Sequence, residues 1–109
     1  MSDVFRLYTG ADGETHFETI EAIPVDVTRA SFGTMPAGGF GDWHNERRRQ
    51  FVITLVGVAE ITVSDGESRR LPPGSVMLAE DLAGKGHQTR VVGDGACSWM
   101  FVALADDVS

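Results

Sequence analysis

The chain has little cysteine, no long apolar run and no clear helical pattern. Cys97 is the single cysteine among 109 residues, so an internal disulfide is excluded and the thiol is expected in the core. No apolar run approaches the roughly 20 residues of a membrane span, and residues 1–10 lack the regions of a secretion signal. We therefore expect a cytoplasmic protein that does not enter the membrane.

Basic residues are also scarce. Nine Lys and Arg stand against sixteen Asp and Glu, which gives a formal charge of -7. This balance disfavours binding to phosphate backbones and anionic lipid surfaces. The Gly-x-Ser-x-Gly motif of serine hydrolases and the Gly-rich, Lys-containing motif of phosphate-binding loops are missing as well. A small-molecule ligand is expected, and nucleic acid is not.

Short β-prone runs, separated by Gly, Pro and Asp, fill the chain. The expected strands are 5–8, 16–20, 25–32, 50–56, 59–63, 67–71, 76–79, 88–92 and 98–104. Turns at 11–13, 64–66 and 93–95 can supply positive φ and predict at least three hairpins. Regularly spaced short strands predict an all-β sandwich or barrel. The length leaves room for one domain.

The most informative segment is FGDWHNERRRQFVITLVG, residues 40–57. If it is a strand, His44, Glu46 and Gln50 share one face because side chains repeat every second residue. His87 follows an expected exposed loop. Two imidazoles, a carboxylate and an amide oxygen suit a divalent transition metal such as Mn, Fe, Ni or Zn. The alternative is a pocket without metal, because a neutral amide binds a cation more weakly than a carboxylate.

This segment resembles the first part of the two-part signature of the cupin superfamily. Gly41 precedes His44 and Gly57 closes the pattern. Glu46 stands at the position of the usual second histidine, and Gln50 stands at that of the usual glutamate. Two of the three ligand types in this part have therefore changed.

A second group resembles the other part of the signature, with Pro73 and Gly74 followed by Gly86 and His87. The resemblance implies one cupin-like domain over 1–109, with its motifs between about 40 and 104, folded as a jelly-roll β-barrel or double-stranded β-helix. It also implies a homodimer that pairs through its outer strands. Cupins include isomerases, dioxygenases, lyases and non-catalytic proteins, so the fold does not name a reaction.

Three arginines lie between the candidate ligands. By strand parity Arg48 points the same way as the ligands, while Arg47 and Arg49 point away. Arg48 could clamp the carboxylate or phosphate of a small anionic substrate. Alternatively, the run solvates an edge strand or pairs with acidic residues at the surface or a dimer seam. Those acids are Glu18, Glu21, Glu80 and Asp81.

Two functional classes follow from these residues. In the first, a metal-dependent lyase, isomerase or dioxygenase uses Glu46 to move a proton, while Arg48 and Trp43 contact the substrate. Trp43 could instead anchor the core or an interface. In the second class, a non-catalytic or metal-free module binds a small molecule in the same pocket. We favour the enzyme.

Overall fold

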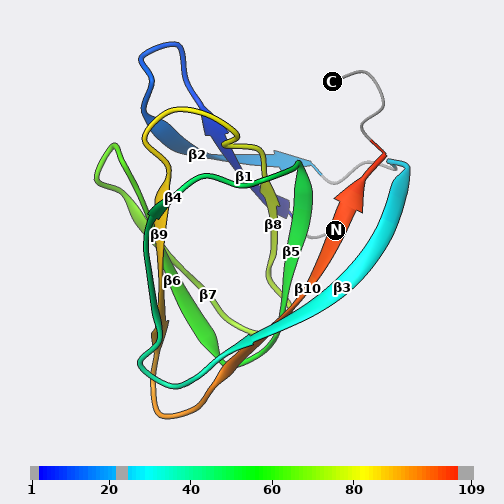
Figure 1. The fold of residues 1–109 in the computed structure, drawn as a ribbon, viewed down its shortest axis with the longest axis vertical. Helices are drawn as coiled ribbons and strands as arrows, with labels where there is room; N and C mark the ends of the chain where they lie inside the picture. Colours follow the sequence, from blue (N-terminus) through cyan, green and yellow to red (C-terminus); the bar gives the residue numbers. More distant parts are fainter. Residues whose placement is uncertain (1–2, 22–24, 106–109) are drawn as a thin grey trace.

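A computed structural model describes residues 3–21 and 25–105, and the regular structure in these ranges is β-strand throughout (Figure 1). The strands are β1 (Asp3–Thr9), β2 (Thr15–Glu21), β3 (Val27–Met35), β4 (Phe40–His44), β5 (Gln50–Val56), β6 (Val58–Val63), β7 (Ser68–Leu71), β8 (Val76–Ala79), β9 (His87–Val92) and β10 (Cys97–Leu104). Within the described ranges, no helix is long and apolar enough to cross a membrane.

The strands form two sheets that face each other as a jelly roll. The larger sheet has the order β2-β1-β8-β5-β10-β3, and the smaller one has the order β4-β9-β6-β7. Figure 1 shows the smaller sheet on the left and the larger sheet on the right. The predicted all-β jelly roll is confirmed. Among the described residues, however, no strand pairs across the two sheets, so they form a sandwich and not the closed barrel that was expected.

The core lies between the sheets and follows from the alternation of the strands. In β6 every second side chain is buried, and in β5 Val52 and Thr54 are buried while Leu55 and Val56 are exposed. Cys97 is fully buried as a free thiol, as predicted. The other large buried side chains between the sheets are Leu7, Ile61, Val63, Leu71, Met77, Val91 and Trp99.

Most expected strands are present, with two differences in how they connect. The turns at 11–13 and 64–66 join antiparallel neighbours, β1 to β2 and β6 to β7. The turn at 93–95 instead joins β9 to β10, which belong to different sheets, so the prediction of a hairpin there is wrong. The segment 40–57 is also not one strand, because β4 and β5 lie in different sheets and residues 45–49 cross between them.

Candidate metal centre

Two histidines meet because β4 and β9 are paired. His44 is opposite His87 in the antiparallel register, and the centroids of their rings are 4.3 Å apart. Gly86 makes this approach possible. Its φ is +80°, and a Cβ at this position would collide with the backbone carbonyl of His44. A glycine before His87 is therefore required both by the backbone conformation and by the close approach of β4.

Glu46 joins the histidine pair from the crossing segment 45–49. Its backbone N–H donates to the carbonyl of Asp81 at 3.2 Å, which fixes the segment at that point. Its Oε2 lies 3.4 Å from Nε2 of His87. One donor atom from each of His44, Glu46 and His87 lies within 4.8 Å of the others. These three predicted ligands therefore form a cluster that could hold a metal ion.

Hydrogen bonds to both rings leave the same nitrogen available on each histidine. Nδ1 of His44 lies 2.7 Å from the carbonyl oxygen of Asp42, and Nδ1 of His87 lies 2.5 Å from Oδ2 of Asp81. Because these oxygens accept a hydrogen bond from Nδ1–H, the Nε2 atoms carry the free lone pairs once His87 is neutral. Oxygen partners behind ligating imidazoles are typical of protein metal sites. The donor set therefore fits a divalent ion.

Asp81 was expected at the surface as a partner for the arginine run, and that expectation is wrong. Its side chain is completely buried and accepts the hydrogen bond from His87. The sequence offered one signal for this contact: Asp81 lies six residues before the candidate ligand His87, at the start of the loop that leads to it. The loop itself is exposed at 82–85, as predicted, whereas both of its ends are buried.

Burial and charge oppose each other in this cluster. Burial lowers the pKa of His87, but the hydrogen bonds and negative charges of Asp81 and Glu46 outweigh it and raise that pKa to about 9. Burial alone would raise the pKa of Glu46, but the hydrogen bond and charge of His87 and the hydrogen bond from Gln50 lower it. Near neutral pH the metal-free cluster therefore holds an imidazolium beside a carboxylate.

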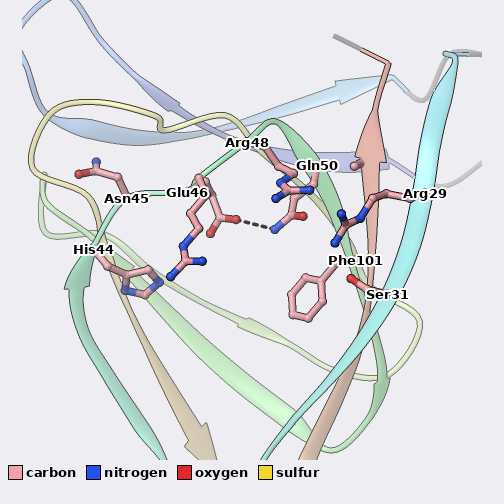
Figure 2. A pocket seen from close by; sticks show the side chains of 10 residues that line it. Arg29, Ser31, His44, Asn45, Glu46, Arg48, Gln50 and Phe101 are labelled. Carbon is pink, nitrogen blue, oxygen red and sulfur yellow. Dashed lines mark hydrogen bonds between the residues drawn. The ribbon is translucent and has the colours of Figure 1, made fainter.

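Gln50 contacts the cluster through Glu46. Its amide nitrogen donates to Oε1 of Glu46 at 2.8 Å, drawn as a dashed line in Figure 2. Gln50 is the first residue of β5, so this bond connects the carboxylate to the larger sheet. Gln50 thus lies beside the three ligands, as expected, and here it orients the carboxylate. Direct ligation by Gln50 stays a prediction.

Two cavities meet at this cluster. The inner one has a volume of about 170 Å³, lies between the sheets and is mostly apolar, with Val52, Ile61, Met77 and Trp99 in its walls. The outer one, of about 420 Å³, opens beside residues 45–48. His44 and Glu46 line both, so a molecule in either cavity has access to the candidate ligands.

The arginine run is arranged differently from the parity prediction. Arg48 lines the outer cavity as expected, but so does Arg47, which was expected to point away. Strand parity fails here because residues 45–49 are not a strand. Arg49 does point elsewhere, and it forms an ion pair with Glu80, one of the acids proposed for it. Arg29, from β3, also lines the outer cavity and was not anticipated, since it is remote from the motif in sequence.

Trp43 lies in β4 directly before His44, and about half of its surface is exposed. It lines neither the inner nor the outer cavity. The structure therefore does not bring it to the candidate ligands, and a role for Trp43 in substrate binding stays a prediction.

No protein-family model matches the sequence, and no curated protein sequence is significantly similar to it. Similar folds are found among solved structures. The cupin domain of Cnp3 from Schizosaccharomyces pombe has a TM-score of 0.57 and 14% identity, covering 95% of this chain and 88% of that one. A cupin domain from Bordetella pertussis Tohama I has a TM-score of 0.56 and 17% identity, covering 75% of this chain and 85% of that one.

A third structure of similar fold is described as a sugar phosphate isomerase of the cupin superfamily from Silicibacter pomeroyi. It has a TM-score of 0.56 and 16% identity, and the match covers 69% of this chain and 48% of that one. The chain thus spans about half the length of that protein. These likenesses define the class: the chain has the cupin fold, and the resemblance recognised in its motifs is confirmed at the level of the fold.

Proposed function

We propose that the protein is a small metal-dependent cupin enzyme of lyase, isomerase or dioxygenase type, acting on a small organic molecule. The observation that carries the proposal is the convergence of His44, Glu46 and His87, whose donor atoms lie within 4.8 Å of one another. Two imidazoles and one carboxylate suit Mn, Fe, Ni or Zn. Such an ion would polarise a carbonyl or hydroxyl group, or bind dioxygen.

The residues of the chain have separable roles in this proposal. The imidazoles of His44 and His87 would hold the ion, while the backbone carbonyl of Asp42 and the carboxylate of Asp81 position the two rings through Nδ1. Glu46 supplies a carboxylate oxygen and holds the proton that the substrate loses or gains. Gln50 orients this carboxylate from the larger sheet. The apolar walls of the inner cavity exclude water from the same place.

Elemental analysis tests the metal centre directly. The untagged protein, expressed in medium with trace amounts of Mn, Fe, Ni and Zn, should retain a single bound ion through purification. His44→Ala and His87→Ala should each lose it while keeping the β-sheet circular dichroism spectrum. His16→Ala is the matched control, because His16 pairs with Asp12 and Asp65 on the surface. A folded wild-type protein with no bound metal, and none taken up on titration, would overturn the proposal.

That outcome would favour the second candidate, a metal-free small-molecule-binding cupin. Protonation of His87 supports it, since an imidazolium paired with Glu46 and Asp81 can fill the cluster without an ion. The two candidates differ in their response to Glu46→Gln. The variant keeps the shape of the side chain, so it should lose turnover in a metal-dependent enzyme while a binding module keeps its ligand.

We also propose that two copies associate through the outer face of the larger sheet. Phe32 is 73% exposed on β3, at the edge of this sheet, and Val56 is 59% exposed on β5. In the strand register, Phe32 is opposite Met100 and Val56 is opposite Ser98. Met100 and Ser98 occupy the alternate positions of β10 that face away from the core. Large apolar side chains on an open sheet face are typical of interfaces between subunits.

A further inference from the structure

The basic residues fall into two groups that differ in their partners. Five of the nine form ion pairs with described carboxylates: Arg6, Arg49, Arg69, Arg70 and Lys85. A sixth, Arg90, packs over the ring of Phe40. The remaining three, Arg29, Arg47 and Arg48, have no ion pair with any carboxylate in the described ranges. All three line the outer cavity. In a chain of net charge -7, three of the four basic side chains that form no ion pair within the described residues are thus gathered at one opening, and the fourth is Arg90.

The strand register explains how Arg29 comes to the opening. Arg29 is opposite Ala103 on β10, and Ala103 is in turn opposite Gln50 on β5. The three positions form one row across the larger sheet, on the face that is turned toward the core. Because the middle residue is alanine, its methyl group leaves space between the two long side chains. Figure 2 shows Arg29 reaching from β3 toward Gln50, with Arg48 beside it and Phe101 below.

Three guanidinium groups around one cavity of about 420 Å³ repel one another, and a bound anion offsets this repulsion. Each guanidinium can hold a carboxylate or a phosphate through two parallel hydrogen bonds. We propose that Arg29, Arg47 and Arg48 form a binding site for the two negative charges of a small organic dianion, either a phosphate monoester or a dicarboxylate. A singly charged ligand would leave the repulsion only partly offset.

The position of this site specifies how such a molecule lies. His44 and Glu46 line the same cavity, so a molecule held at its charged end by the arginines extends toward the candidate metal ligands. The cavity volume falls within the range of about 300 to 1,000 Å³ that is common for small-molecule sites. That this dianion is the substrate rests on the proposed function. That the arginines bind it does not depend on a metal.

Titration of metal-free protein tests the site, with backbone NMR shifts as the readout. The probes are methyl phosphate, malonate and acetate at pH 8, where the first two carry two negative charges. Methyl phosphate, malonate or both should bind at least about tenfold more tightly than acetate. The shifts should occur around Arg29, Arg48 and Ser31, which also lines the outer cavity. Whichever of the two dianions binds more tightly identifies the charged group.

Arg29→Gln and Arg48→Gln should each weaken binding of the better dianion about tenfold or more. Arg70→Gln is the matched control: it removes the same charge from β7, where Arg70 pairs with Glu60 in the smaller sheet. The proposal is overturned if the dianions bind no better than acetate, or if all three variants bind alike. Repeating the titration with His87→Ala separates the two proposals, because the arginine effect should persist in a protein that cannot bind metal.

Discussion

His44 and His87 lie directly opposite each other in the β4–β9 pair, with their ring centroids 4.3 Å apart. Neither ring depends on a long loop for its position, because each residue is the last or first of a paired strand. Both Nδ1 atoms are engaged with oxygen atoms, and Nε2 of His87 lies 3.4 Å from Oε2 of Glu46. The register of two strands in the smaller sheet therefore determines where an ion could bind, and this relationship can be tested by disturbing the pair.

Gly86→Ala should displace β4 from β9. The new Cβ would collide with the carbonyl of His44, and Gly86 has a φ of +80° that other residues adopt only with strain. We expect a loss of about 2 to 4 kcal/mol in the free energy of unfolding, together with loss of metal binding. Gly93→Ala is the control, since Gly93 has a φ of +85° but nothing near the added methyl group. Equal losses in urea denaturation of the two variants would contradict the close approach.

Asp81→Asn should lower the pKa of His87 from about 9 toward its usual value near 6.5, because the buried negative charge beside Nδ1 is removed. Titration of the imidazole NMR signals in metal-free protein measures this shift directly. His16, on the surface between Asp12 and Asp65, serves as an internal reference that should not move. Metal affinity should also fall by about 10- to 100-fold. An unchanged His87 titration would show that Asp81 does not act on the ring.

The stability of the metal-free protein should fall as the pH rises from about 6.5 through about 9. His87 has a raised pKa in the folded state, so its contribution is complete below its unfolded pKa and disappears as the folded imidazolium loses its proton. The contribution is on the order of a few kcal/mol. Thermal melts between pH 6 and 10 measure it, and His87→Gln should flatten the profile. Metal affinity should rise over the same range, because the proton competes with the ion for Nε2.

Gln50→Glu should have opposite effects on the metal-free and the metal-bound protein. Without metal, the new carboxylate replaces an amide that donates to Glu46, so two acids face each other and the melting temperature should fall. With metal, the added charge should increase the affinity, as measured by competition with a chelating dye. Gln50→Met, which removes the amide without adding charge, is the control. Affinity for metal that is unchanged or weaker in Gln50→Glu would count against a position for Gln50 next to the ion.

Phe32→Glu should weaken association of two copies of the chain. This side chain is 73% exposed on the outer face of the larger sheet, and a buried carboxylate without a partner is costly at an interface. Light scattering after size-exclusion chromatography should show a dimer for the wild-type protein and a monomer for the variant. Leu82→Glu is the control, because Leu82 is also exposed but lies in the loop between β8 and β9. A wild-type monomer would refute the proposed dimer.

Local sequence signals predicted the strands well because they depend on short-range chemistry. β5 and β8 have the expected bounds, and Pro73 and Gly74 lie between β7 and β8. The burial of Val52 and Thr54 in β5 follows the alternation of side chains along a single strand, which needs no knowledge of the neighbouring strands. Three of the four candidate ligands converge as expected, although His44 and His87 meet through the β4–β9 pairing and Glu46 joins them from the crossing segment.

The predictions failed where the chain passes from one sheet to the other. Asn45 to Arg49 contain neither Gly nor Pro, so the sequence carried no signal that β4 ends at His44, and parity was extended through a bend. The position of Arg29 in the outer cavity and the burial of Asp81 beside His87 depend on strand pairing and on packing between distant segments. Contacts between distant segments cannot be predicted from the local patterns of a single sequence.

The crossing segment 45–49 joins the two halves of the candidate site covalently. Glu46, whose carboxylate belongs to the ligand cluster, is followed immediately by Arg47 and Arg48 at the outer cavity. The hydrogen bond from its backbone to Asp81 holds the segment at Glu46. A cation at the cluster and an anion at the arginines would therefore act on consecutive residues. If binding at one of the two places changes the affinity at the other, thermodynamic reciprocity requires that the change be the same in both directions.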